Sequence, residues 1–114
     1  MKSFRNHVQL IGRLGADPEV KTLDKGLKVA RLSLATHEVS IRQGKRVEET
    51  VWHRLVVWGK LADTCQQFLS KGREVAVSGR LTYNTWKDSN GQTHTNTLIV
   101  VNELLMLGGS AGAR

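Results

Sequence analysis

The sequence of 114 residues holds one cysteine, Cys65, and one proline, Pro18. A single thiol excludes an internal disulfide and any zinc site built from several cysteines, and it favours a reducing compartment. No apolar run approaches the roughly 20 residues of a membrane-spanning helix, and the polar pair Asn6-His7 stands where a signal peptide would be apolar. We therefore expect an intracellular protein of one domain with no membrane partner.

Acidic residues are also scarce, since 10 Asp and Glu stand against 17 Lys and Arg and give a formal net charge of +7. A content of 39% hydrophobic and 24% charged residues is typical of a globular domain rather than a disordered chain. An excess of cations attracts nucleic acid, anionic membrane surfaces or acidic proteins. The charge alone does not discriminate among these three partners.

Apolar and polar residues alternate along most of the chain, which predicts β-strands. We expect a short extended piece at 19–23 and strands at five segments: 8–14, 27–36, 50–58, 73–86 and a last one ending at 107. A turn at 87–91 joins the last two strands. The cationic segment 38–48 holds Arg42, Lys45 and Arg46 around Gly44, and we expect it to form the flexible tip of a hairpin.

One segment has the period of a helix instead. It runs from Lys60 to Lys71, is followed by Gly72, and places four apolar residues on one stripe: Leu61, Cys65, Phe68 and Leu69. Five strands with a helix between the third and the fourth is the order of an OB-fold, a five-stranded Greek-key barrel that binds oligonucleotides. Other small barrels share the strand number, but a helix at that position favours the OB-fold.

The predicted domain covers residues 1–107. The last segment, 108–114, is rich in glycine and small residues. We expect it to be disordered, as the start of a C-terminal linker or a truncated tail.

The strand at 50–58 separates two kinds of side chain. One parity carries Val51, His53, Leu55 and Val57, and the other carries Trp52, Arg54, Val56 and Trp58. Binding of single-stranded nucleic acid needs cations along the phosphates and exposed aromatic faces on which bases stack. The candidates for stacking are Trp52, Trp58 and Trp86. The candidates for phosphate contacts are Arg54, Arg80, Lys87, Arg42, Lys45 and Arg46.

Other interpretations compete with this one. A single tryptophan in a small barrel is more often a core residue, and we expect that role for Phe68 and Tyr83. The three tryptophans lie opposite the apolar parity as a group, although a protein interface would also suit that face. No metal or other cofactor is expected, because ligand spacing is absent around the four histidines: His7, His37, His53 and His94. The pair Gly59-Lys60 lacks the glycine-rich segment of a phosphate loop, and no nucleophile has a neighbouring base.

Several segments resemble the bacterial single-stranded DNA-binding protein family over nearly the whole chain. The opening Asn6-His-Val-Gln-Leu-Ile-Gly-Arg-Leu-Gly-Ala-Asp-Pro-Glu19 resembles the family's first strand and turn. The segment Leu32-Ser-Leu-Ala-Thr36 is similar to its second strand, and Trp52-His-Arg-Leu-Val-Val-Trp-Gly-Lys-Leu61 to its central strand and helix entry. The likeness continues in order through Lys71-Gly72, Gly79-Arg-Leu81, Trp86-Lys-Asp88 and Met106-Leu-Gly-Gly109.

The resemblance implies an OB-fold subunit of a homotetramer that binds single-stranded DNA without sequence preference in replication, recombination and repair, in the bacterial cytoplasm at the nucleoid. It aligns Trp52 and Trp86 with stacking tryptophans, and Trp58 with a stacking aromatic that is commonly Phe. A further stacking Trp of the family falls near Ser40, where this sequence has no aromatic residue. The family usually ends in an acidic tip that recruits genome-maintenance proteins, whereas this chain ends at Arg114, so such partners are expected only if a native tail is missing.

The sequence thus predicts a protein that binds single-stranded DNA and is not an enzyme. Two alternatives of another class stay open. A primosome-type OB protein would use the same fold to bridge replication proteins, and a small nucleic-acid-dependent enzyme would need a site that the sequence does not display. A sequence-specific reader of duplex DNA is not expected, because no recognition helix with polar base-reading residues is visible.

Overall fold

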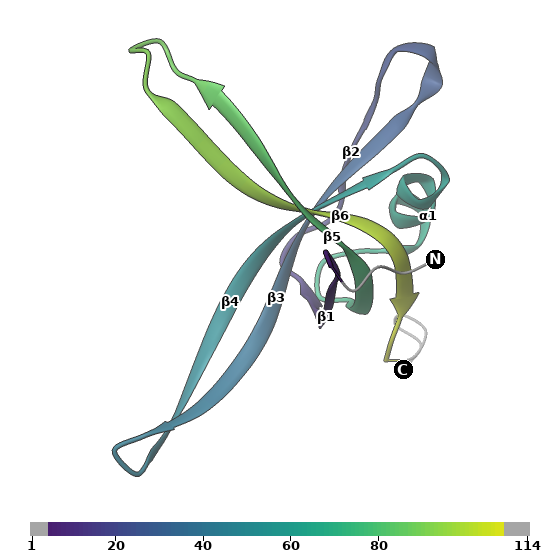
Figure 1. Cartoon of the computed structure of the whole chain (residues 1–114). Helices are drawn as coiled ribbons and strands as arrows, with labels where there is room; N and C mark the ends of the chain where they lie inside the picture. The colour runs from purple at the N-terminus through teal and green to yellow at the C-terminus, as the bar shows by residue number, and fades with distance from the viewer. Residues whose placement is uncertain (1–4, 109–114) are drawn as a thin grey trace.

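A barrel of five strands forms the centre of the molecule (Figure 1). The computed structural model describes residues 5–108. Its elements are β1 (Val8–Leu14), β2 (Glu19–Thr22), the short 3-10 helix η1 (Asp24–Gly26), β3 (Lys28–Arg42), β4 (Lys45–Trp58), α1 (Lys60–Phe68), β5 (Glu74–Lys87) and β6 (Thr93–Met106). The expected disorder of 109–114 lies outside the described residues.

The strands follow the order β1-β5-β6-β4-β3, and β3 returns to β1 through the pairs Arg13↔Ala35 and Leu14↔Leu34. The short β2 pairs with β3 outside this closed ring. Only β4 and β6 run parallel among the described pairs. In chain order, β4 and β5 are the third and fourth strands of the ring, and α1 lies between them. The predicted OB-fold is therefore confirmed.

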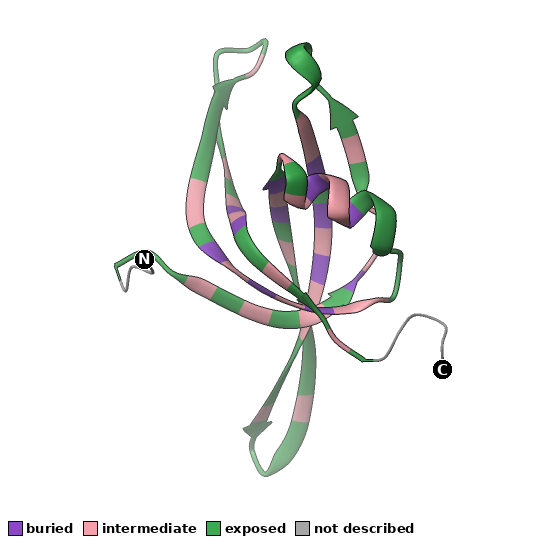
Figure 2. Ribbon diagram, turned by 90° about the vertical axis from the view of Figure 1, so that its right-hand side faces the viewer, coloured by how far each residue is buried: buried purple, intermediate pink, exposed green. Residues whose placement is uncertain are grey.

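Alternation along the strands determines which side chains enter the core. The buried residues are aliphatic or small: Leu14, Ala30, Leu32, Leu34, Leu55, Val57, Ala62, Cys65, Leu69, Val75, Val77, Ile99 and Val101. Figure 2 shows these positions in purple in the middle of the strands and along α1. Burial of one Leu or Val side chain contributes about 1.5 to 3 kcal/mol. The opposite parity is left for the surface.

The helix ends earlier than the sequence pattern indicates. Helix α1 stops at Phe68, and Leu69 already has an extended backbone with φ −102° and ψ 149°. The buried stripe is formed by Ala62, Cys65 and Leu69, so Phe68 lies beside it and is exposed, and its expected core role is wrong. Burial raises the pKa of the Cys65 thiol to about 11, which keeps the sulfur protonated. No helix within residues 5–108 is long and apolar enough to cross a bilayer.

The segment 38–48 belongs to the expected hairpin, but nearly all of it is strand. Strands β3 and β4 stay paired from Val29↔Trp58 to Arg42↔Lys45, so only Gln43 and Gly44 remain for the turn. Both turn residues have positive φ, 53° and 77°, as the type I′ hairpin turn requires. The hairpin is thus confirmed, but its turn is much shorter than expected, because the polar residues of this segment form a complete backbone ladder. Figure 1 shows the resulting arm, which projects far from the barrel.

Strands β5 and β6 form a second arm of the same kind. Their pairing continues to Lys87↔Thr93, beyond the end of the core, as the sequence predicts for a long last hairpin. Tyr83 lies on this extension and is exposed, so its expected core role is wrong. The alternation of this strand does not reveal where the core ends.

Two glycines let backbones approach each other closely. A Cβ at Gly12 would meet the carbonyl oxygen of Ala35, where β1 reaches β3. A Cβ at Gly79 would meet the carbonyl oxygen of Val100, next to the irregularity in the β5–β6 register. No side chain fits at either place without displacing backbone.

Candidate nucleic-acid interface

The outward side chains of β3, β4, β5 and β6 form one continuous surface, which we call the outer face. The strand register places Arg31 opposite Val56, Val56 opposite Val100, and Val100 opposite Arg80. A row across four strands therefore has a guanidinium at each end and apolar side chains in the middle. Sequence reasoning missed Arg31, although its alternation with the buried Ala30 and Leu32 predicts an outward side chain.

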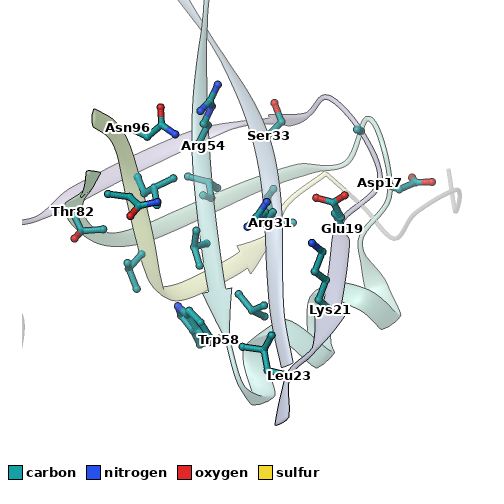
Figure 3. A pocket seen from close by; sticks show the side chains of 18 residues that line it. Asp17, Glu19, Lys21, Leu23, Arg31, Ser33, Arg54, Trp58, Thr82 and Asn96 are labelled. Atoms are coloured by element: carbon teal, nitrogen blue, oxygen red, sulfur yellow. The ribbon is translucent and has the colours of Figure 1, made fainter. Parts of the chain in front are cut away.

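An open groove of about 1010 Å³ lies on the outer face and extends to β2. Figure 3 shows Arg54 and Trp58 of β4, Arg31 of β3 and Asn96 of β6 around it. Three cations and two carboxylates line the groove: Lys21, Arg31, Arg54, Asp17 and Glu19. One of these carboxylates is already engaged, because Oδ1 of Asp17 accepts the backbone N–H of Lys71 at 2.8 Å. Apolar surface between mobile cations suits a chain of flat bases linked by anions.

All three tryptophans are exposed. The exposed fractions are 59% for Trp52, 45% for Trp58 and 43% for Trp86, so none of them is a core residue. Trp52 and Trp58 lie six residues apart on the same parity of β4, which separates them by about 20 Å. The indole of Trp52 lies over Gly15, where the lack of a side chain leaves room for the ring.

Trp86 lies near the end of the β5–β6 arm and has an aromatic neighbour. Its indole stacks on the imidazole of His94, with ring centroids 5.2 Å apart and planes inclined by 25°. Nε2 of His94 in turn lies 2.8 Å from Oδ2 of Asp88. Sequence reasoning missed His94, because only the cross-strand register Trp86↔His94 brings the two rings together.

The predicted phosphate contacts divide into two groups. Arg54 and Arg80 are exposed on the outer face and form no ion pair within the described part of the chain. Lys87 is exposed as well, but it follows Trp86 directly and therefore belongs to the other face of the arm. Of the six candidates, the structure brings two close to the groove.

The remaining three candidates lie at the end of the β3–β4 arm and are partly neutralised. Arg42 contacts Glu49 at 3.3 Å and Arg46 contacts Glu48 at 3.5 Å. The whole segment 37–50 has three cations and three carboxylates and hence no net charge. The positive charge expected from Arg42, Lys45 and Arg46 is therefore confined to these side chains and is balanced over the segment as a whole.

The arm also shows what occupies the region around Ser40. Ser40 lies on the inner parity of β3, and its hydroxyl is buried without a hydrogen-bond partner in the described structure. Val39 and Ile41 lie on the outer parity and are exposed. At this point of the arm the outer face therefore carries the aliphatic side chains of Val39 and Ile41.

A family comparison bears directly on this arrangement, because the model of the single-strand binding protein family matches residues 5–107. This chain belongs to that family. Single-stranded DNA-binding protein 1 of Chlorobaculum tepidum is 46% identical to it over 105 residues, which cover 90% of this chain and 65% of the relative. The chain thus spans just under two thirds of that relative's length.

Solved structures resemble this single-strand binding family member over most of its length. The Plasmodium falciparum SSB in its complex with ssDNA has a TM-score of 0.85 and 36% identity, with 95% of this chain and 98% of that chain covered. A deletion mutant of the single-stranded DNA binding protein from Thermus aquaticus has a TM-score of 0.81 and 28% identity, with 91% and 51% covered. Both likenesses confirm the fold.

The contact between Gly15 and Trp52 gives a direct test of whether the indole of Trp52 packs over the backbone of Gly15. In Gly15→Ala, the new Cβ would lie 2.5 Å from Cζ3 and 2.8 Å from Cη2 of Trp52, so the ring has to move. We expect a loss of about 1 kcal/mol in the free energy of unfolding and a shifted indole Nε1–H resonance for Trp52. In a Trp52→Ala background the same substitution should be nearly neutral. Equal losses in both backgrounds would contradict the contact.

Proposed function

We propose that this chain binds single-stranded DNA without sequence preference, and that its outer face is the binding surface. The observation that carries the proposal is that three exposed tryptophans share the outward parity of β4 and β5 with Arg54 and Arg80, which form no ion pair among residues 5–108. The relatives support the same ligand, since one is a single-stranded DNA-binding protein and another is an SSB in complex with ssDNA.

The binding would combine stacking with phosphate neutralisation. Stacking of one base on an aromatic side chain contributes about 1 to 3 kcal/mol and tolerates every base, because all bases have a π face. Arg54 lies between Trp52 and Trp58 on the same parity of β4, so phosphates between two stacked bases would pass close to its guanidinium. The predicted contacts at Arg80, Lys87 and the cations of the β3–β4 arm remain part of the proposal.

Selection of single strands follows from the same surface. Base faces are covered by neighbouring bases in a duplex, so the tryptophans would have nothing to stack on. Binding rather than catalysis is proposed: within residues 5–108, the paired His94 and Asp88 have no hydroxyl or thiol nucleophile hydrogen-bonded to them. Replication, recombination and repair in the bacterial cytoplasm, at the nucleoid, expose such strands and are the proposed setting.

Titration with oligo(dT) tests the stacking. Tryptophan fluorescence should be strongly quenched at saturation, and Trp52→Ala and Trp86→Ala should each weaken binding by about 1 to 3 kcal/mol. Tyr83→Ala is the matched control, because this exposed aromatic lies on the opposite parity of β5 from Trp86. Affinities that stay unchanged in both tryptophan variants would refute stacking at these sites.

The salt dependence of binding tests the assignment of cations. Each phosphate neutralised contributes a slope of about −0.7 in log K against log salt concentration for single strands. Arg54→Gln should remove close to one such contribution, because Arg54 forms no ion pair among residues 5–108. Arg46→Gln should remove less, because Arg46 already contacts Glu48. The reverse order of the two slopes would contradict the assignment.

We further infer a homotetramer in which β1 and its neighbouring sheet form the contacts. One edge of β1 pairs with β5 over 8–13, but among residues 5–108 the other edge pairs with β3 only at Arg13 and Leu14, which leaves much of it open there. Next to this edge, Ile11 pairs with Ala76 and Ala76 with Leu105, and both Ile11 and Leu105 are exposed. In this assembly the open edge of β1 pairs with a second copy of the chain. The apolar sheet face of the resulting dimer packs on another dimer, which gives two types of twofold contact.

Light scattering tests this assembly. The wild-type protein should have about four times the 12.7 kDa mass of one chain. Ile11→Glu should lower the mass to that of a dimer, because it places a charge in the apolar contact but leaves the backbone edge intact. Phe68→Glu, on the exposed side of α1, should remain tetrameric. A monomeric wild type, or equal effects of both substitutions, would contradict the inference.

A further inference from the structure

The turn between β5 and β6 is organised around the carboxylate of Asp88. Its Oδ1 accepts the backbone N–H of Asn90 at 2.9 Å and that of Gln92 at 3.0 Å. The backbone N–H of Asp88 also donates to the carbonyl of Gln92 at 2.9 Å, and Gly91 N–H donates to the carbonyl of Asp88 at 3.0 Å. The carboxylate is therefore fixed by the turn, independently of any ligand.

The other carboxylate oxygen of Asp88 orients His94. Nε2 of His94 lies 2.8 Å from Oδ2, a distance at which the imidazole N–H donates a strong hydrogen bond to the carboxylate. This bond, followed by the bond from the Gln92 N–H, lowers the pKa of Asp88 below its ordinary value. The carboxylate thus remains ionised through the neutral and mildly acidic range, and it continues to accept the hydrogen bond from His94 there.

The oriented imidazole lies against one face of the Trp86 indole, at the centroid distance of 5.2 Å given above. Since 43% of Trp86 remains exposed, much of the indole stays available to a ligand. We propose that His94 is a positioning residue: its imidazole, anchored by Asp88, supports one face of Trp86 so that the opposite face is presented to a DNA base. This inference rests on the proposed function and extends it by one residue that does not itself need to touch DNA.

The physical reason is the entropy of an exposed side chain. An unsupported indole on a solvent-exposed arm samples several rotamers, and a base that stacks on it has to select one. A ring fixed in advance avoids that cost, so support by His94 should increase affinity by roughly two- to tenfold. Trp52 and Trp58 lie on β4 and would not depend on this support.

Two substitutions of His94 separate its ring from its hydrogen bond. His94→Gln retains a donor for Asp88 and removes the aromatic face, whereas His94→Phe retains the aromatic face and removes the donor. Thr95→Val is the control, because Thr95 pairs with Thr85 through their hydroxyls at 3.3 Å on the other parity of the same arm. His94 is exposed, so we expect thermal unfolding to stay unchanged in all three variants.

The first measurement is made on the full chain without DNA. Relaxation of the 15N-labelled indole groups should show the largest increase in motion of Trp86 in His94→Gln, a smaller increase in His94→Phe, which keeps the ring but loses the Asp88 anchor, wild-type order in Thr95→Val, and no change at Trp52 or Trp58 in any variant. Unchanged order of Trp86 in His94→Gln would overturn the proposal. Equal disorder in His94→Phe and His94→Gln would overturn it too, because the ring would then not be the supporting element.

The second measurement is oligo(dT) affinity at one salt concentration. His94→Gln should bind roughly two- to tenfold more weakly than wild type, with His94→Phe between the two. Wild-type affinity in His94→Gln, alongside increased motion of Trp86, would overturn the role of the support in binding. A wild-type protein that does not bind oligo(dT) would refute the proposed function instead, and the relaxation result would still decide whether His94 supports the indole.

Discussion

Closure of the barrel between β1 and β3 is the constraint on which the other features depend. Only two residue pairs join these strands, and Gly12 lies so close to the carbonyl of Ala35 that no side chain fits there. The seam is extended by the backbone N–H of Gly15, which donates to the carbonyl of Ser33 at 2.9 Å. Closure decides which parity of each strand faces the core, and so which parity forms the outer face. The same seam positions Gly15 under the indole of Trp52.

The two arms have a different physical basis from the barrel. Beyond the core, β3–β4 and β5–β6 are held by backbone ladders and cross-strand pairs, with exposed side chains on both faces. The positions of rings on an arm are therefore set by register rather than by packing density. This explains why the support of Trp86 comes from one cross-strand neighbour and a turn carboxylate, whereas Trp52 lies on the backbone of the barrel.

Periodicity in the sequence was sufficient to predict the order of strands and helix along the chain and the exposed tryptophans, because a barrel core imposes period two on every strand that lines it and the helix has its own period. The same signal failed where no core is present. Tyr83 keeps the parity of Val75 and Val77 but lies past the end of the barrel, and nothing local marks that point. The ion pairs of Arg42 and Arg46, and the ring pair of Trp86 with His94, depend on cross-strand register, which a single sequence does not give.

The composition of the β3–β4 arm has a thermodynamic consequence. With no net charge over 37–50 and with Val39 and Ile41 exposed on the outer parity, a ligand lying along the arm would release few counterions there and would dehydrate aliphatic surface instead. Removal of apolar surface from water is recognised by a negative change in heat capacity. The two ends of the proposed binding surface would thus respond to different variables: the groove mainly to ionic strength, and the arm mainly to temperature.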